Sequence, residues 1–417
     1  MQVIILAAGE SSRFWPLNQK HKSLFKIMGK PLIFYLLNEL KKVGLKEVII
    51  VQKPNRDVEK ELKNFPFSQL KITYTIQKKP TGTGDAVLTA KDFIKDKFLV
   101  LNAERVDCRE WVREVIKKGK KEEKTAVLLS APTTNPWIFG NLKIKGDKVL
   151  DIVEKPKKGK EFSNLKTVGL YLFPKEALFF LKKFTKNSYS LIETLKIFAK
   201  KGDLKWVKME KESLHLKYPW NLFDYAEYFS RGLKLKILGK VEKGTQIRGR
   251  VFVGKNTWVK KGAVIEGAVY IGENCQVGPN CYIRGTTFIE DNCKIGNGVE
   301  IKNSIIGAGT KISHLSYIGD SILGEECNIG AGTISANLRF DGKEIKVLVK
   351  GEKISTTLQK LGAIVGENTQ IGINTSLMPG VLIGRDCWIG PHSFVSENIK
   401  DESIFYNKFQ KIIKKRK

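Results

Sequence analysis

Hydrophobic positions follow different periods in the two halves of the chain. In residues 1–230, short apolar runs alternate with amphipathic stretches. The apolar runs are 3–8, 47–51, 72–76, 98–101 and 126–129, and the helix-like stretches lie near 31–43, 85–94, 111–118 and 221–235. Strands that alternate with helices at this spacing predict a Rossmann-like α/β domain with a mostly parallel sheet covered by helices. In such sheets, ligands bind beyond the carboxyl ends of the strands.

From about residue 240, an aliphatic side chain recurs at every sixth position. The run begins at Ile247, continues without a miss to Ile301, and is often followed by glycine. Two five-residue steps follow, at Ile306 and Leu323, and the six-residue period resumes at Val365. A sustained hexapeptide period predicts a left-handed parallel β-helix, in which three short strands make one coil and the aliphatics fill the interior.

The same period accounts for the cysteines. Five of the six lie four residues after a core aliphatic, namely Cys275, Cys281, Cys293, Cys327 and Cys387. That slot takes a small inward side chain, so the sequence predicts buried free thiols in preference to a metal site. Reduced cysteines also agree with a cytoplasmic location.

The repeat is interrupted once, over residues 336–361. This stretch carries basic side chains suited to phosphates, namely Arg339, Lys343, Lys346, Lys350, Lys353 and Lys360. Long excursions from a regular repeat are often functional. The domains predicted from these patterns are 1–232 (α/β domain), 233–245 (linker), 246–402 (β-helix with the inserted loop 336–361) and 403–417 (basic tail).

Composition narrows the location and the partners. The first residues form a buried strand rather than a signal peptide, and no apolar stretch approaches the ~20 residues of a membrane span, so a cytoplasmic protein without membrane association is expected. The formal net charge is +30. Such an excess attracts anions, including nucleotides and coenzyme A. Because lysine is scattered along the chain, a solvated surface is favoured over a nucleic-acid-binding face.

Small residues and cations follow the first predicted strand. Ala8 and Gly9 allow backbone N–H groups to approach a phosphate, and Arg13 and Lys22 add positive charge. With the run from Lys22 to Leu32, this set resembles the signature of the sugar-1-phosphate nucleotidyltransferases. The resemblance implies that Arg13 and Lys22 stabilise the charge that builds on the α-phosphate during in-line attack.

The resemblance continues along the N-terminal half. It implies nucleotide binding by Ala8, Gly9, Gln77, Gly82 and Thr83, and sugar binding by Gly140, Glu154 and Lys155. It also implies a magnesium site formed by Glu104 and Asn221. Glu104 stands where the family has aspartate; its carboxylate oxygens suit Mg²⁺, but the longer side chain would move the metal by about an ångström.

Three residues suggest chemistry in the C-terminal half. His314 follows the core residue Ile312 by two positions and should therefore point outward near a turn. Arg284 and Lys302 are one full coil apart, so they should stack on a single outer face as a phosphate clamp. Together with the run 328–337 and the basic loop, they resemble the bifunctional N-acetylglucosamine-1-phosphate uridyltransferase/glucosamine-1-phosphate acetyltransferases, in particular their archaeal-type branch.

This second resemblance implies roles for further residues. His314 would be the general base for acetyl transfer from acetyl-CoA, and the backbone N–H of Ala331 would face the oxyanion. The sugar phosphate would be held by Arg284, Lys302, Tyr317, Asn328 and Lys343, with Asn337 orienting the amine and Lys346 assisting. The family also implies Mg²⁺, acetyl-CoA as co-substrate and a homotrimer through the β-helix.

The favoured hypothesis is a bifunctional enzyme that acetylates glucosamine-1-phosphate and joins a sugar-1-phosphate to UTP or dTTP, releasing pyrophosphate. Two alternatives stay open. One is a glucose-1-phosphate thymidylyl- or uridylyltransferase with the β-helix as a trimerisation scaffold. The other is a non-catalytic sugar-nucleotide-binding subunit, favoured if Glu104 fails to place magnesium. His21, in the nucleotide loop, is assigned no role.

Overall fold

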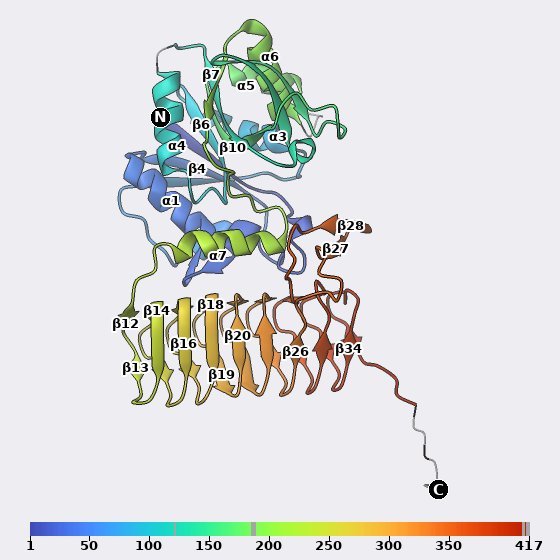
Figure 1. Cartoon of the computed structure of the whole chain (residues 1–417). Helices are drawn as coiled ribbons and strands as arrows, with labels where there is room; N and C mark the ends of the chain where they lie inside the picture. The colour runs from blue at the N-terminus through green and yellow to red at the C-terminus, as the bar shows by residue number, and fades with distance from the viewer. Residues whose placement is uncertain (121, 185–188, 411–412, 414–417) are drawn as a thin grey trace. The chain divides into compact units, whose positions relative to one another are not determined.

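The computed structural model describes residues 1–120, 122–184, 189–410 and 413, and its chain divides into two compact units (Figure 1). Unit 1 comprises Met1–Glu10, Lys20–Phe25 and Pro31–His215, and unit 2 comprises Ser11–Gln19, Lys26–Lys30 and Leu216–Lys417. Because the units interleave along the chain, the predicted linear boundaries stay a prediction. Most of the lysine run in the predicted tail, at 411–412 and 414–417, lies outside the described residues. Among the described residues, no helix has the length and apolarity needed to cross a membrane.

Unit 1 is built on one large sheet. Its strands are β1 (Gln2–Ala7), β4 (Glu47–Gln52), β5 (Lys71–Ile76), β6 (Phe98–Asn102), β7 (Ala126–Pro132), β8 (Gly140–Lys145), β9 (Lys148–Glu154), β10 (Leu165–Phe173) and β11 (Leu204–Lys208). They lie in the order β5-β4-β1-β6-β10-β7-β11-β9-β8. Within the described residues, only β9 and β10 run antiparallel to the other strands of this sheet. Strand β10 pairs antiparallel with its neighbours β6 and β7, and strand β9 pairs antiparallel with its neighbours β11 and β8. The predicted mostly parallel sheet is confirmed.

Helices cover both faces of this sheet. They are α1 (Leu32–Val43), α2 (Asp57–Leu62), α3 (Thr83–Thr89), α4 (Arg109–Gly119), α5 (Ala177–Lys183) and α6 (Ser190–Lys201). Successive strand residues point to opposite faces, so Val3 and Ile5 belong to one apolar core while Ile4 belongs to the other. The carboxyl ends of β1 and β6 are thereby fixed side by side, with Ala8 following one of them.

Unit 2 contains a parallel β-helix (Figure 1). One of its sheets consists of β12 (Lys236–Ile237), β14 (Gln246–Val253), β16 (Val264–Ile271), β18 (Tyr282–Ile289), β20 (Glu300–Lys302), β21 (Ile305–Ile306), β23 (Tyr317–Gly319), β24 (Ile322–Leu323), β26 (Ile334–Ser335), β29 (Ile364–Val365), β31 (Ser376–Leu377), β32 (Leu382–Ile383) and β34 (Phe394–Val395). The other consists of β13 (Lys240–Val241), β15 (Trp258–Val259), β17 (Gln276–Val277), β19 (Lys294–Asn297), β22 (Lys311–His314), β25 (Asn328–Ile329), β30 (Gln370–Ile371), β33 (Trp388–Ile389) and β35 (Ile404–Phe405).

The interior of the coils confirms the hexapeptide prediction. The aliphatics from Val253 to Ile301 are fully buried in one continuous core, and the five predicted cysteines lie in the same core. Residues one coil apart are paired in register, for example Tyr282 with Glu300. The five-residue steps shorten a coil, so that Glu300 pairs in turn with Tyr317. The backbone hydrogen bonds between coils therefore continue across the shortened coils, and the aliphatic side chains still face the interior.

At one corner of the β-helix, where each coil turns from one face to the next, the residues have positive φ. Gly249, Gly267 and Gly285 bend the long strands there, with φ of 95°, 110° and 74°. A Cβ on Gly285 would lie 2.0 Å from Oδ1 of Asn303, so the site requires glycine. Asn303 and Asp320 take the same corner in the next coils with φ of 45° and 48°. Their side chains consequently follow the edge between two faces of the β-helix.

The predicted interruption of the coils is confirmed as well. Leu323 pairs directly with Val365, although of the described strands only β25 and β26 belong to the coils between them, so the chain from the end of β26 to the start of β29 leaves the repeat. It forms a hairpin of β27 (Lys346–Val349) and β28 (Glu352–Ser355), anchored by the buried side chains of Ile345 and Val347. Unit 2 also contains α7 (Leu222–Ser230), where a helix was expected over 221–235.

A buried carboxylate of the β-helix holds a short N-terminal turn within unit 2. Met28 and Gly29, with φ of 58° and 71°, connect β2 (Lys26–Ile27) and β3 (Lys30–Pro31). Their backbone N–H groups donate to Glu290 at 2.8 and 2.6 Å. Burial raises the pKa of Glu290 to about 7, although these two hydrogen bonds favour the charged form.

Replacing this carboxyl should change how stability depends on pH. Because the pKa of Glu290 is raised in the folded chain, its contribution to stability is complete below about pH 4.5 and is lost as the pH rises through about 7. The free energy of unfolding of the wild type should therefore fall relative to that of Glu290→Gln by up to about 3 kcal/mol between about pH 5 and 8. Urea unfolding at both pH values measures this. Glu273→Gln, at an exposed position of the same coil, is the control; a difference for Glu290→Gln that is equal at both pH values would contradict the assignment.

Candidate functional site

Residues from four separate stretches of the N-terminal half line one cavity in unit 1. Its volume is about 290 Å³. Seven of the residues singled out from the sequence lie on its wall, namely Ala8, Gly9, Lys22, Gln77, Gly82, Thr83 and Glu104. Ala8 and Gly9 follow β1, Gln77 follows β5 and Glu104 follows β6, at the carboxyl ends where parallel sheets bind ligands. Gly82 and Thr83 begin α3, and Lys22 lies in the 3-10 helix Lys22–Leu24. The structure therefore brings together a set that the sequence predicted piece by piece.

A lysine and a carboxylate face each other in this cavity. Lys22 Nζ lies 2.6 Å from Glu104 Oε1, and the two side chains are 22% and 8% exposed. Lys22 sits in the one-turn 3-10 helix Lys22–Leu24, and Glu104 follows β6. A carboxylate offers about four lone-pair sites, so Glu104 can hold Lys22 and still contribute an oxygen to a hard cation. Glu104 thus fits the predicted magnesium site.

The loop before α3 is braced by a glutamine. Gln77 Nε2 donates to the carbonyl of Gly82 at 3.0 Å and to Asp85 Oδ2 at 2.8 Å. Thr81 Oγ1 donates to the same carboxylate oxygen. Gly82 has φ of 136°, a conformation that favours glycine. These bonds fix the entry to α3, so the first N–H groups of the helix are presented to the cavity.

The predicted sugar-binding residues form a second cluster in unit 1. Gly140 pairs with Glu154 across β8 and β9, and a Cβ on Gly140 would lie 2.7 Å from Thr167 Oγ1. Burial, followed by the charge of Glu154, raises the pKa of Tyr171 well above its usual value. Lys155 is exposed and lies over the ring of Tyr189. Gly140 and Glu154 are thus close together, while the side chain of Lys155 lies against Tyr189.

Two predicted residues of the nucleotidyl-transfer site belong to unit 2. Arg13 is exposed and lies in the 3-10 helix Ser12–Phe14. Asn221 is mostly buried, and its Oδ1 accepts the backbone N–H groups of Lys217 and Tyr218 at 3.1 and 3.0 Å. Asn221 can therefore ligate a metal only by giving up one of these bonds, and its role as a ligand stays a prediction.

Arg284 and Lys302 are register partners on adjacent coils, as the period predicted. Each is paired with a carboxylate. Arg284 Nη2 lies 2.8 Å from Glu300 Oε1, and both side chains are about one third exposed. Lys302 Nζ lies 3.1 Å from Asp320 Oδ2, and these side chains are only 15% and 12% exposed. A phosphate at this face would meet cations that carboxylates already orient.

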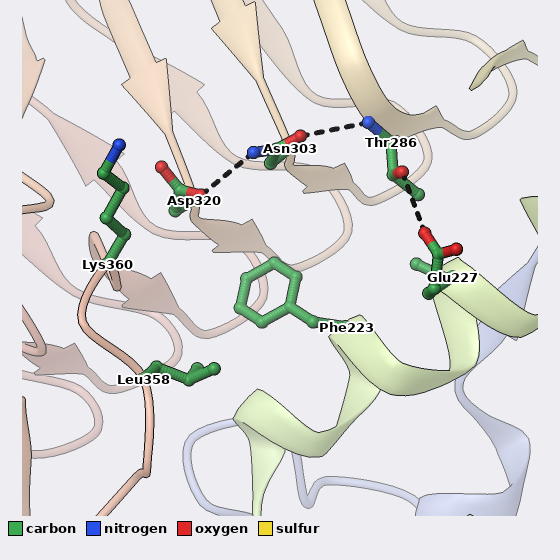
Figure 2. Close-up of a pocket in the computed structure, with 8 residues that line it drawn as sticks. Phe223, Glu227, Thr286, Asn303, Asp320, Leu358 and Lys360 are labelled. Carbon is green, nitrogen blue, oxygen red and sulfur yellow. Dashed lines mark hydrogen bonds between the residues drawn. The ribbon is translucent and has the colours of Figure 1, made fainter. Parts of the chain in front are cut away.

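Asp320 is the centre of a hydrogen-bond network along the glycine-lined corner. Figure 2 shows the first links: the N–H of Thr286 donates to Asn303 Oδ1, and Asn303 Nδ2 donates to Asp320 Oδ1, at 3.0 and 3.2 Å. Asn337 Nδ2 donates to Asp320 and to the hydroxyl of Tyr317. The network joins the predicted residues Lys302, Tyr317 and Asn337.

This corner opens into a cavity of about 270 Å³ in unit 2. Its wall includes Phe223 and Glu227 of α7 and Lys360 of the inserted loop (Figure 2). The hydroxyl of Thr286 donates to Glu227 at 3.3 Å, which ties α7 to the coil. A hydroxylated ligand would find a ring face, two carboxylates and a cation here.

The remaining predicted acetyl-transfer residues lie on the adjoining face and the inserted loop. His314 is exposed at the end of β22, directly before Leu315, whose φ of 43° turns the chain. Asn328 begins β25 in the next coil of the same sheet. Within the described residues, the backbone N–H of Ala331 donates no hydrogen bond, which suits a donor to an oxyanion.

The single chain does not gather all these groups into one cluster. Lys343 and Lys346 are exposed on the inserted loop, and no bond joins them to Arg284 or Lys302 in the described residues. Lys343 is instead linked through its backbone N–H to Asp341. The roles of His314, Ala331, Lys343 and Lys346 stay predictions.

Sequence analysis missed the carboxylates that hold the two cations and the amide that bonds one of these carboxylates. Asp320, Glu300 and Asn303 were not singled out, although Asn303 and Asp320 are one shortened coil apart and could have been found with the same repeat. In unit 1, His21 and Asn102 line the cavity without having been assigned a role. The local sequence places His21 in the nucleotide loop but does not indicate that its side chain is buried.

These two units define the protein as a nucleotidyltransferase fold combined with a hexapeptide-repeat transferase fold. The nucleotidyl transferase family matches residues 2–214, a family described as the GMPPB C-terminal domain matches 265–358, and the bacterial transferase hexapeptide family matches 362–397. The family matches thus cover both units.

Curated relatives align along the full length. Bifunctional protein GlmU of Methanococcus maripaludis (strain C7) is 40% identical, and that of Methanocaldococcus jannaschii 35% identical, each over all of both chains. The bifunctional sugar-1-phosphate nucleotidylyltransferase/acetyltransferase of Sulfurisphaera tokodaii is 35% identical over 96% of this chain and 98% of the relative. The chain belongs to this family of bifunctional sugar-1-phosphate nucleotidyltransferase/acetyltransferases, as the resemblance in its sequence predicted.

The Lys302–Asp320 pair should contribute more to stability than the Arg284–Glu300 pair. Removing one member of a mostly buried ion pair leaves an uncompensated charge, so Lys302→Met or Asp320→Asn should each cost about 3–5 kcal/mol of unfolding free energy. The double variant should recover part of this, giving a coupling energy of about 1–3 kcal/mol in a double-mutant cycle. The matched cycle of Arg284→Met and Glu300→Gln, at more exposed side chains, should give at most about 1 kcal/mol. Equal coupling in the two cycles would contradict the role given to burial.

Proposed function

We propose that this chain is a bifunctional enzyme of sugar-nucleotide synthesis. The C-terminal coils acetylate the amino group of glucosamine-1-phosphate with acetyl-CoA, and the cavity of unit 1 transfers a nucleotidyl group from UTP or dTTP to the sugar-1-phosphate. The observation that carries the proposal is the convergence of seven predicted residues on that one cavity. The names of the full-length relatives support both activities.

Nucleotidyl transfer needs an anion site that becomes stronger as the reaction proceeds. An oxygen of the sugar phosphate attacks the α-phosphorus, and pyrophosphate leaves with the electrons of the broken bond. Backbone N–H groups around Gly9 and at the start of α3 bind the nucleotide phosphates, and Lys22 and Arg13 stabilise the charge that grows on the α-phosphate. Gly140, Glu154 and Lys155 bind the sugar.

Magnesium is the ion that this family implies. When bound, it neutralises charge on the phosphates, and Glu104 and Asn221 are the residues proposed to hold it. The pairing of Glu104 with Lys22 supports one site for the metal and the nucleotide phosphates, because the carboxylate proposed to hold the metal also orients the lysine proposed to contact the α-phosphate.

Acetyl transfer needs a base and an oxyanion site. The amine of the sugar attacks the thioester carbonyl while His314 accepts its proton. When the tetrahedral intermediate collapses, the C–S bond breaks, and the departing thiolate of coenzyme A takes up that proton from His314. The N–H of Ala331 stabilises the oxyanion. Arg284, Lys302, Tyr317, Asn328 and Lys343 hold the sugar phosphate, Asn337 orients the amine and Lys346 assists.

The family also implies assembly through the β-helix, and we propose a homotrimer. Large apolar side chains on the outer faces of the last coils support an interface, since Trp388 and Phe394 are 62% and 52% exposed. In such an assembly a second copy can bring groups of its own to the face that carries Arg284 and Lys302.

Loss of Lys22 should impair nucleotidyl transfer alone. Pyrophosphate release, measured with UTP and dTTP against glucose-, glucosamine- and N-acetylglucosamine-1-phosphate, should fall about 10²–10³-fold in Lys22→Ala, because a cation that stabilises the transition state is lost. Lys63→Ala, at an exposed position after α2, should keep full activity. No pyrophosphate release from the wild type with any combination would favour the non-catalytic alternative.

Loss of His314 should impair acetyl transfer alone. Thiol release from acetyl-CoA with glucosamine-1-phosphate should fall about 10²–10⁴-fold in His314→Ala, while pyrophosphate release stays unchanged. His392→Asn is the control, because His392 is also an exposed histidine of the coils and asparagine tolerates its φ of 56°.

The second candidate function keeps nucleotidyl transfer, to glucose-1-phosphate, and leaves the β-helix as a scaffold. The pairing of both Arg284 and Lys302 with carboxylates favours it, because these cations then serve stability. Absence of thiol release from the wild type, with pyrophosphate release intact, would select this alternative.

A further inference from the structure

His21 lies in the wall of the nucleotide cavity, directly before Lys22. Its side chain is 3% exposed. The backbone N–H of His21 donates to Asp57 Oδ2 at 2.9 Å, and Asp57 in turn lies 3.6 Å from Lys53 Nζ. The residue is therefore held from outside its own turn, by the start of α2.

The imidazole caps the one-turn helix that carries Lys22. Its Nδ1 accepts the backbone N–H of Ser23 at 3.3 Å and lies 2.8 Å from Ser23 Oγ. The carbonyl of His21 accepts the N–H of Leu24 at 2.8 Å, which closes the turn. A nitrogen that accepts an N–H bond carries no proton, so the ring proton must sit on Nε2.

The surroundings keep this ring uncharged. Burial, with the nearby charges of Lys22 and Lys53, lowers the pKa of His21 to about 3. Asp57 and Glu104 are the acidic groups on the elements around it, and Asp57 already accepts the backbone N–H. A protonated ring could not accept the N–H of Ser23, so the cap requires the neutral form.

We propose that His21 is a positioning residue for nucleotidyl transfer: as a neutral acceptor it caps the turn Lys22–Leu24 and thereby aims Lys22 at Glu104 and the cavity. Lys22 has a long flexible side chain, and its backbone is fixed only if this single turn is fixed. A one-turn helix has little stability of its own, so a cap at its first residue decides its conformation. The inference rests on the proposed nucleotidyl-transfer activity.

Two substitutions separate this role from simple packing. In His21→Asn, the amide Oδ1 stands at the position of Nδ1 and can accept the N–H of Ser23, so kcat should stay within about threefold of the wild type. In His21→Leu, a side chain of similar bulk has no acceptor. Its kcat for pyrophosphate release should fall about 10–100-fold with a smaller change in KM, because Lys22 acts mainly in the transition state.

Acetyl transfer by the same variants is the internal control and should be unchanged. Wild-type kcat in His21→Leu would overturn the proposal, and so would a His21→Asn variant as impaired as His21→Leu. A wild-type protein that releases no pyrophosphate would instead refute the proposed function. The capping role of the His21 ring would then be tested by its tautomer.

The tautomer of the His21 ring gives a second test, which does not require that the His21→Leu variant folds. In ring-¹⁵N-labelled protein, NMR should show the His21 signal, assigned by its loss in His21→Asn, with an unprotonated Nδ1 and a protonated Nε2, unchanged between about pH 5 and 8. A proton on Nδ1, or a ring that titrates in this range, would overturn the proposal.

Discussion

Both candidate sites depend on a lysine that a carboxylate holds in a mostly buried position. Lys22 is paired with Glu104 in unit 1, and Lys302 with Asp320 in unit 2. Desolvation would strongly destabilise an unpaired ammonium group in either place, whereas a paired ammonium group keeps its charge and a fixed orientation. Such a site is oriented before a phosphate arrives, and the phosphate then adds a second negative partner to the cation.

Uncharged groups complete the orientation. His21 caps the turn that carries Lys22 as a neutral acceptor, and Asn303 links Thr286 to Asp320 along the corner of the β-helix. Neutral acceptors suit this task because they add no charge to sites that must bind an anion. The strength of each site therefore comes from a few cations, and its geometry from hydrogen bonds that surround them.

The net charge of the chain explains much less than these pairs do. Most of the lysines that the structure describes are exposed. Exposed charges act mainly through a long-range attraction of anions, which salt screens. Selectivity for a position on the substrate has to come from buried groups. Glu290 illustrates the same rule outside the sites, since burial raises the pKa of its carboxyl while the N–H groups of Met28 and Gly29 stabilise the charge.

The sequence by itself determined the two architectures and most of one site. A hexapeptide period specifies which side chains face the interior, because each residue's place in a coil is set by its distance from the last core aliphatic, and Ile295 or Cys275 could be placed without coordinates. The signature residues Gly9, Lys22 and Glu104 could likewise be assigned to one site from the family resemblance, and the structure places all three on the wall of one cavity.

Only the tertiary structure decided the partners of the charged groups. The pairing of Lys302 with Asp320, the uncharged state of the His21 ring and the membership of Ser11–Gln19 in unit 2 all depend on contacts between residues distant in sequence or on burial. Burial changes the pKa of a group and the cost of leaving it unpaired, and neither is encoded in the spacing of residues along the chain.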